Sequence, residues 1–282
     1  MDTRPLPPSL NHLGHIPRLG LIAGAGRLPF LIAQAAAKVS LPVTAFAVEG
    51  ITPPELADHV DRIHWMKLGQ FSRFIKQLHA DEIRHVVMVG HVPHNAIWRY
   101  RGFDLRSLRL LAGMLTRKAD SVLGTVVREL ERENIAVIDS TLLLRGHMPG
   151  KGLLTPKRPL TAREQKDIDF GFPIARRIAG MDVGQTIVVK DLAVVAVESL
   201  EGTDETILRG GRIADGDIVV IKVAKPRQDA RFDVPVVGPE TIRTIQKAGG
   251  GVLAIMADSA LFLDQDEAIS LAEQAGIAIA AV

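Results

Sequence analysis

Short apolar runs that end in glycine alternate with helix-like segments along this chain of 282 residues, and this alternation restricts the fold more than any other feature. The apolar run that begins at residue 18 stops at glycines, and residues 29–39 then have a helix-favouring composition. Apolar runs at 41–50 and 84–92 flank a segment, 69–83, whose apolar residues have helical spacing. This order predicts a mainly parallel, Rossmann-like sheet with helices on its faces.

The composition fits such a sheet, because 47% of the residues are hydrophobic but only 4% are aromatic, which leaves Ala, Val, Ile and Leu to fill the core. The absence of cysteine excludes disulfides and thiolate metal sites. Apolar runs of eighteen residues are also absent, so we expect a cytoplasmic protein whose contact with a membrane is peripheral at most. Residues 1–17 carry Asp2 and four prolines and are predicted to be a loose leader.

A second domain is predicted after a segment in which glycine and proline recur without periodicity. We expect an N-terminal domain over 1–146, a linker over 147–161 and a C-terminal domain over 162–282. The latter begins with a helix at 161–179, which Thr161 and Glu164 would start as a capping box. Two strands joined at Lys190 and Asp191 predict a hairpin. The second domain is therefore expected to be a mixed α/β sheet.

The net charge of +2 conceals an asymmetry between the two halves of the chain. Residues 1–150 contain 18 basic and 13 acidic side chains, whereas residues 151–282 contain 16 and 19. Much of the basic excess lies between Trp98 and Lys118, which could face phosphates or an anionic membrane leaflet, or could be a solvated helix face. The excess is small and aromatic residues are scarce, so nucleic-acid binding is not expected.

The glycines after the first predicted strand are the first candidate for phosphate binding. Gly24, Ala25 and Gly26 could let backbone amides approach a phosphate at the start of the next helix, or could form only a tight turn. A dinucleotide fingerprint requires a third glycine where Pro29 stands. Glu49, at the end of the next strand, keeps a nucleotide-dependent oxidoreductase open as an alternative.

A second turn, at Gly90 and His91, follows another strand of the predicted parallel sheet. Open sheets of this class bind ligands at the carboxyl ends of their strands, so we expect this turn beside the first one. His91 and His94 could be metal ligands, but without a third ligand they are more typical of surface or polar-network residues.

Gly202 and Thr203 precede a predicted helix in the second half. They could present amides and a hydroxyl to an anion, or Thr203 could be an ordinary N-cap, with Asp204 complementing the helix dipole. The sequence favours neither.

The stretch from Lys222 to Gly238 mixes cations, carboxylates and prolines. In a phosphoryl-transfer site, Lys222 and Lys225 would neutralise phosphate oxygens while one of the aspartates of the stretch, Asp229 or Asp233, held a magnesium ion. A surface network of ion pairs would show the same pattern.

Four motifs, 117–123 (RKADSVL), 182–189 (DVGQTIVV), 195–207 (VAVESLEGTDETI) and 225–242 (KPRQDARFDVPVVGPETI), are similar to those of a known family. The chain resembles the UDP-2,3-diacylglucosamine pyrophosphatases of the LpxI type over nearly its whole length after the leader. The resemblance implies Mg²⁺-dependent hydrolysis of a lipid-linked sugar nucleotide to UMP and 2,3-diacylglucosamine 1-phosphate, in lipid A synthesis of Gram-negative bacteria.

The resemblance also implies that the two domains close over the substrate in a cleft, and it implies residue roles. Asp233 would be the catalytic and metal-binding carboxylate. The substrate-binding residues would be Gly24, Ala25, Gly26, Gly90, His91, Lys118, Asp120, Gln185, Gly202, Thr203, Asp204, Lys222, Lys225 and Gln228. Two acyl chains need an apolar site, which the aliphatic composition can supply. The sequence leaves a homodimer open, as it does a non-catalytic protein that binds a sugar nucleotide or lipid.

Overall fold

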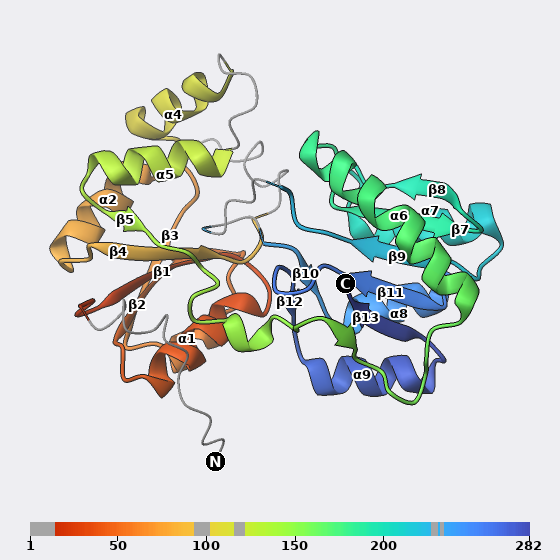
Figure 1. The fold of residues 1–282 in the computed structure, drawn as a ribbon. Helices are drawn as coiled ribbons and strands as arrows, with labels where there is room; N and C mark the ends of the chain where they lie inside the picture. Colours follow the sequence, from red (N-terminus) through yellow and green to blue (C-terminus); the bar gives the residue numbers. More distant parts are fainter. Residues whose placement is uncertain (1–14, 93–101, 116–121, 227–230, 232–233) are drawn as a thin grey trace. The chain divides into compact units, whose positions relative to one another are not determined.

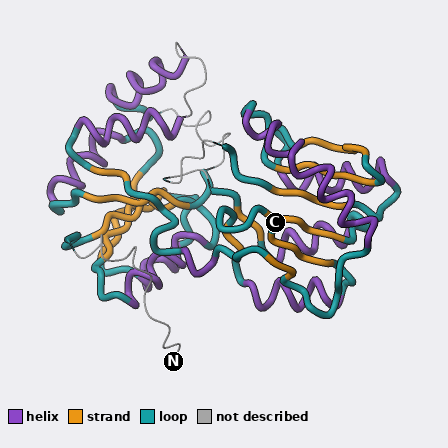
Figure 2. The backbone as a smooth tube through the Cα atoms, in the orientation of Figure 1, coloured by secondary structure: helices purple, strands orange, loops and turns teal. Residues whose placement is uncertain are grey.

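The computed structural model describes residues 15–92, 102–115, 122–226, 231 and 234–282. The described residues up to Leu144, with Arg231, form unit 1, and the others from Arg145 onward form unit 2. Each unit contains a sheet with helices on both faces (Figures 1 and 2). The predicted fold class, α/β with a parallel first sheet and a mixed second sheet, is confirmed. The cleft stays a prediction.

The sheet of unit 1 is parallel throughout and has the strand order β3-β2-β1-β4-β5. The strands are β1 (Leu19–Ala23), β2 (Val43–Val48), β3 (Arg62–Met66), β4 (His85–Val89) and β5 (Ala136–Val137). The central strands are buried on both faces, which explains their continuous apolar runs. The sequence analysis missed β3, because this edge strand is only partly buried and lacks such a run.

Helices cover both faces of this sheet (Figure 1). They are α1 (Leu28–Lys38), α2 (Phe71–Ala80), α4 (Leu105–Leu115) and α5 (Val122–Arg132), with a 3₁₀ turn, η2, at Pro54–His59. Leu78 of α2 and Leu130 of α5 pack with Phe46 and Val86 in one core, and α1 lies on the opposite face. The carboxyl ends of β1 and β4, where the glycine turns begin, lie side by side in the sheet.

The main sheet of unit 2 has the strand order β6-β13-β11-β9-β7-β8. Its strands are β6 (Gly152–Leu153), β7 (Thr186–Lys190), β8 (Ala193–Val197), β9 (Val219–Lys222), β11 (Val252–Ile255) and β13 (Ala278–Ala281). The strands β9, β11 and β13 are parallel, whereas β7 is antiparallel to both β8 and β9. A small second sheet pairs β10 (Val236–Val237) with β12 (Leu261–Phe262). Residues 147–161, expected as a linker, include β6, which pairs with β13.

Helix α6 (Ala162–Gly180) covers one face of this sheet and packs on Ile187 and Val219. The other face carries α7 (Thr203–Ala214), α8 (Pro239–Lys247) and α9 (Gln265–Gln274). The structure confirms the capping box at the start of α6: Glu164 N donates to Thr161 Oγ1 and Thr161 N donates to the Glu164 carboxylate. Within the described residues, no helix is long and apolar enough to cross a bilayer.

The predicted hairpin is formed by β7 and β8, but its turn lies one residue later than expected. Lys190 pairs with Ala193, so the two turn residues are Asp191 and Leu192, both with positive φ angles. Such a conformation is unfavourable for leucine. The buried carboxylate of Asp167, on α6, accepts hydrogen bonds from both turn amides and thereby stabilises it.

Candidate functional site

The two glycine turns of unit 1 are joined to each other directly. Ala25 N donates to His91 O at 2.8 Å, and His91 N donates to Ala25 O at 3.0 Å. A Cβ atom on Gly24 would lie 2.8 Å from the Gly90 carbonyl carbon, and Gly90 also has a φ angle of +91°. Both positions therefore require glycine, because any side chain would separate the turns.

This arrangement limits how the turns can bind a phosphate. The amides of Gly24 and Ala25 already donate to Val89 O and His91 O, so they are not available to a ligand. A phosphate would have to use Gly26 and the amides that follow it at the start of α1. Gly26, Gly90 and His91 are exposed at this edge of the sheet, so the turns remain candidates for substrate contact.

Unit 2 contains a pocket of about 310 Å³ at the ends of β9 and β8. It is lined by Asp182, Val183, Gly184, Gln185, Glu198, Ser199, Lys222, Lys225, Val234, Pro235 and Val236. The pocket thus brings together three residues that the sequence analysis assigned to the substrate: Gln185, Lys222 and Lys225. It also contains the residues that follow directly after Asp233 in the chain.

A chain of hydrogen bonds runs along one wall of this pocket. Lys222 Nζ donates to Thr203 Oγ1 at 2.9 Å, and Thr203 Oγ1 donates to Glu198 Oε1 at 2.8 Å. The second oxygen of Glu198 accepts from Gln185 N at 3.2 Å. Glu198 therefore orients the Thr203 hydroxyl, which accepts the hydrogen bond from Lys222, and this holds the ammonium of Lys222 in one position.

Lys222 is a half-buried cation of this site. Desolvation of its ammonium group lowers its pKa below the usual value, although the carboxylates of Glu198 and Asp204 act in the opposite direction. The ammonium has thus lost water without forming a direct ion pair with either acid in the described structure. A ligand with negative charge would compensate for the lost solvation, and this is the strongest indication of an anion site in unit 2.

The start of α7 differs from the prediction that Thr203 is an ordinary N-cap. Gly202, with a φ angle of +84°, is the N-cap residue, and Thr203 is the first residue of the helix. The Thr203 hydroxyl does not cap the helix but contacts Lys222 and Glu198. Asp204 lies in the first turn and is exposed.

Glu198 was missed as a site residue because it lies in a segment rich in acids, where nothing distinguishes it. Its position at the end of β8, directly before the loop that leads to Gly202 and α7, could have indicated it. Lys225 is positioned differently from Lys222: its Nζ lies 2.6 Å from Asp182 Oδ1, and Asp182 is exposed. Lys118, Asp120, Gln228, Asp233 and His94 lie outside the described residues.

In the described ranges there is no group of three or more His, Asp or Glu side chains that could hold a metal ion. Magnesium does not need such a group, because it is commonly bound by one or two carboxylates together with substrate phosphates and water. The pocket contains Lys222 and Lys225, and Asp233 follows them in the chain. This combination of two cations and one carboxylate fits magnesium bound together with a phosphate better than magnesium bound by protein ligands alone.

Comparison with known proteins identifies the family. The family model described as "LpxI N-terminal domain" matches residues 18–147, and the one described as "LpxI C-terminal domain" matches residues 150–280. The chain belongs to the LpxI family. The resemblance of the four motifs is thus confirmed, and the family's two domains follow each other here in the same order.

A relative of known name matches this chain over nearly the full length of both proteins. The "UDP-2,3-diacylglucosamine pyrophosphatase LpxI" of Caulobacter vibrioides is 28% identical over 276 residues, which cover 94% of this chain and 97% of the relative. Among solved structures, glycinamide-RNase-transformylase T from Mycobacterium tuberculosis is 12% identical, with 65% of this chain and 45% of that chain covered. Its TM-score is 0.24, too low to inform the fold or the function.

Proposed function

We propose that this protein hydrolyses the pyrophosphate bond of UDP-2,3-diacylglucosamine to give UMP and 2,3-diacylglucosamine 1-phosphate, a step of lipid A synthesis. The observation that carries the proposal is the match to both LpxI domains over residues 18–147 and 150–280, together with a full-length relative that is named for this activity. The lysine pocket of unit 2 supports it chemically, because a diphosphate is the anion that the reaction requires the protein to bind.

The reaction is a hydrolysis in which no redox partner takes part. A water oxygen forms a bond to one phosphorus of the pyrophosphate, and the bond from that phosphorus to the bridging oxygen breaks. The bridging oxygen leaves with the other phosphate, and a proton from the water is released. Negative charge accumulates on the non-bridging oxygens, so cations positioned beside them lower the barrier.

Lys222 and Lys225 are the residues that we assign to those oxygens. Lys222 is held by Thr203, which in turn is oriented by Glu198, so the cation would not need to reorganise when charge develops. Glu198 touches no substrate in this scheme and is a positioning residue. Gln185, whose amide is bound by Glu198, lies in the same pocket.

We assign Asp233 as the carboxylate that binds Mg²⁺. Its neighbour in the chain, Val234, lines the lysine pocket. When bound, the ion would supply further neutralisation of the diphosphate. From the resemblance to the family, we also propose that the turns at Gly24–Gly26 and Gly90–His91 bind the nucleotide or its phosphates. Lys118, Asp120 and Gln228 are proposed on the same resemblance to bind substrate. Cytoplasmic location, membrane contact and a homodimer stay predictions from the sequence.

An assay of the purified protein tests the proposal. UDP-2,3-diacylglucosamine is incubated with the wild type, with and without Mg²⁺, and UMP is measured. We expect release of UMP that requires Mg²⁺. The Asp233→Ala variant should lose turnover and still bind substrate, whereas Asp266→Ala, which removes an exposed carboxylate on α9, should behave as wild type. Substrate that binds without release of UMP would instead indicate a binding protein.

A further inference from the structure

Helix α4 presents leucines on the side that faces away from unit 1. Leu105 is 75% exposed and Leu108 is 48% exposed. Residues three or four positions apart share one face of a helix, so these leucines and the exposed Arg109 form a single surface, which we call the outer face of α4. Single exposed leucines are common, but neighbouring ones on one helix face form an apolar patch, which is typical of an interaction surface.

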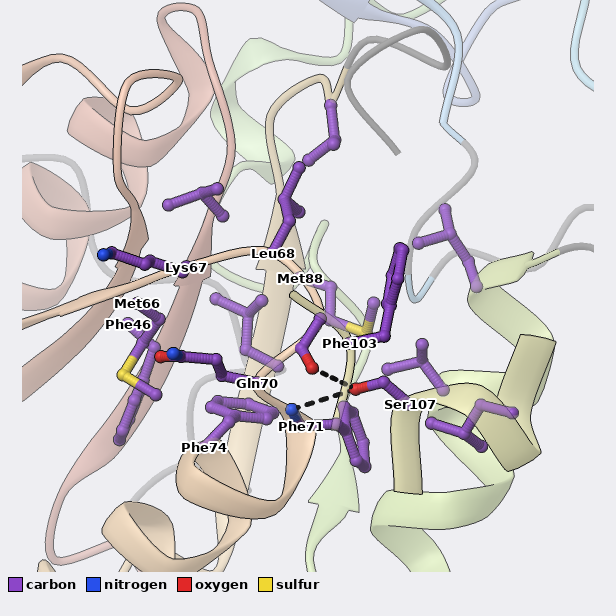
Figure 3. Close-up of a pocket in the computed structure, with 17 residues that line it drawn as sticks. Phe46, Met66, Lys67, Leu68, Gln70, Phe71, Phe74, Met88, Phe103 and Ser107 are labelled. Atoms are coloured by element: carbon purple, nitrogen blue, oxygen red, sulfur yellow. Dashed lines mark hydrogen bonds between the residues drawn. The ribbon is translucent and has the colours of Figure 1, made fainter. Parts of the chain in front are cut away.

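The inner side of α4 is fixed to the rest of unit 1. Ser107 Oγ donates to Gly69 O at 2.7 Å and accepts from Phe71 N at 3.1 Å, as the dashed lines in Figure 3 show. Ser107 and Leu110 line an apolar pocket of about 250 Å³, which also includes Val92, beside the glycine turns. The inner side of the helix is thus packed, and its outer face is the part that can contact another surface.

The charges nearest to the start of α4 are used within unit 1. Arg106 pairs with Glu129 and Glu133, which joins α4 to α5. Asp104 accepts hydrogen bonds from Ser107 N at the start of α4 and from Ser72 N at the start of α2. These interactions hold the helix in place, and Figure 1 shows α4 outside α5, at the edge of unit 1.

The sequence of this region gives the outer face of α4 a basic surrounding. Helix α4 itself contains no acidic residue, and Arg109 adds an exposed cation to its two exposed leucines. Asp104 is the one acid between Trp98 and Lys118. The segments that flank the helix in the chain add only basic residues: Arg99, Arg101, Arg117 and Lys118. Apolar side chains beside cations are typical of helices that lie on an anionic membrane surface.

We propose that the outer face of α4 docks on the surface of an anionic lipid bilayer. Leu105 and Leu108 insert at the boundary between head groups and acyl chains, and Arg109 meets the lipid phosphates. The charge of this region complements such a bilayer, whereas a second copy of the same basic face would be repelled. The inference goes beyond the proposed function, whose lipid-linked substrate would be held in a bilayer of this kind.

Sedimentation with lipid vesicles, in the absence of substrate, tests the proposal. Vesicles that contain phosphatidylglycerol are compared with vesicles of phosphatidylcholine alone. The double variant Leu105→Gln/Leu108→Gln removes the apolar part of the outer face without changing the charge. Leu192→Gln/Ile213→Gln is its matched control, because these two side chains of unit 2 are 53% and 63% exposed.

We expect the wild type to sediment with the phosphatidylglycerol vesicles. Leu105→Gln/Leu108→Gln should bind them at least tenfold more weakly, because transfer of one leucine side chain from water to an apolar medium corresponds to more than tenfold in affinity. Arg109→Gln should bind about fivefold more weakly, as one lost cation near an anionic surface predicts. On phosphatidylcholine, Arg109→Gln and wild type should bind equally weakly, and the control variant should bind like wild type throughout.

Wild type that does not bind the phosphatidylglycerol vesicles, or an equal loss in the control variant, would overturn the proposal. A dimer in analytical ultracentrifugation that Leu105→Gln/Leu108→Gln converts to a monomer would also overturn it, since the face would then bind a second copy. Thermal unfolding checks that the variants fold. If the double variant does not, Leu105→Gln alone replaces it, with Ile213→Gln as the control.

Release of UMP from UDP-2,3-diacylglucosamine dispersed in detergent separates this proposal from the proposed function. We expect equal rates for wild type and both double variants, because the outer face of α4 is not part of the proposed catalytic site. If the vesicle results are as expected but no UMP is released, the membrane assignment holds and the hydrolase proposal fails. If UMP is released and the wild type does not bind the vesicles, the hydrolase proposal holds and the membrane assignment fails.

Discussion

At the scale of a single residue, Lys222 is the main support for the anion site that we propose in unit 2. Its ammonium is desolvated, which lowers its pKa, and its hydrogen-bond acceptor in the structure is a neutral hydroxyl, that of Thr203. The charged form of such a lysine destabilises the folded protein relative to the same residue in water. A residue that costs stability and lines a pocket is typical of a binding or catalytic site.

Replacement of Lys222 should therefore separate activity from stability. We expect Lys222→Met to reduce kcat/KM for UDP-2,3-diacylglucosamine about a hundredfold, because a cation that stabilises the developing charge is lost. Its melting temperature should be unchanged or higher, since methionine avoids the desolvation. Lys190→Met is the control, because Lys190 ends the neighbouring strand β7 and donates to a backbone oxygen, Ala214 O. Lower stability together with lower activity in Lys222→Met would argue for a structural role.

Sequence reasoning could predict some of these residues and not others. Lys222 and Thr203 stand out because a cation ends an apolar strand and a threonine follows a glycine. The contact between Lys222 and Thr203 could not be predicted, because 18 residues lie between them in the chain. The Thr203 hydroxyl could equally have capped helix α7. Glu198 gave only one signal, its position at the end of a strand, and that position does not reveal which side of the strand end faces Lys222.

Helix α6 illustrates how a charged pair supports an element of unit 2. Glu164 is almost completely buried and accepts two hydrogen bonds from the guanidinium of Arg158, at 2.6 and 2.7 Å, besides its bond from Thr161 N. Burial raises the pKa of this carboxyl, but the bonds from Arg158 and Thr161 outweigh it, so the pKa lies below its ordinary value. The ionised form is thus favoured by folding.

Replacement of Glu164 by glutamine should destabilise the protein by about 2 kcal/mol near neutral pH, because the half-buried guanidinium of Arg158 loses its counter-charge and the capping box is weakened. A carboxyl with a lowered pKa stabilises the fold above its ordinary value, 4.5, and this stabilisation disappears as pH falls through the folded-state pKa. Urea unfolding should therefore show a difference between wild type and Glu164→Gln that shrinks below pH 4.5. A difference independent of pH would contradict this explanation. Asp169→Asn, on the exposed side of α6, serves as the control.

The elements themselves were predictable where their burial was complete. The capping box of α6 follows from local hydrogen-bond chemistry, and the apolar strands of both units follow from burial on two faces. The sequence analysis missed β3 because Met66 is the one buried residue of this strand, and it missed β10 because two residues are too short for a pattern. The hairpin turn was misplaced by one residue, since Asp167 stabilises it from a distant helix.

At the scale of the whole molecule, the chain combines two α/β units with different candidate sites. Unit 1 contains the paired glycine turns and an apolar pocket beside them, and unit 2 contains the lysine pocket. The proposed substrate is a lipid-linked sugar nucleotide, and its diphosphate is the part that the lysine pocket of unit 2 suits. The apolar pocket could not be predicted from composition, because aliphatic residues fill an ordinary core in the same proportions.

The most direct test of the account is the fate of solvent oxygen in the reaction. UDP-2,3-diacylglucosamine is incubated with the protein and Mg²⁺ in ¹⁸O-labelled water, and the products are weighed by mass spectrometry. The account predicts equal amounts of UMP and 2,3-diacylglucosamine 1-phosphate, with one solvent oxygen in one of the two, and no product from Asp233→Ala. Release of UDP, which would mean cleavage at the sugar, or no release of any nucleotide, would contradict it.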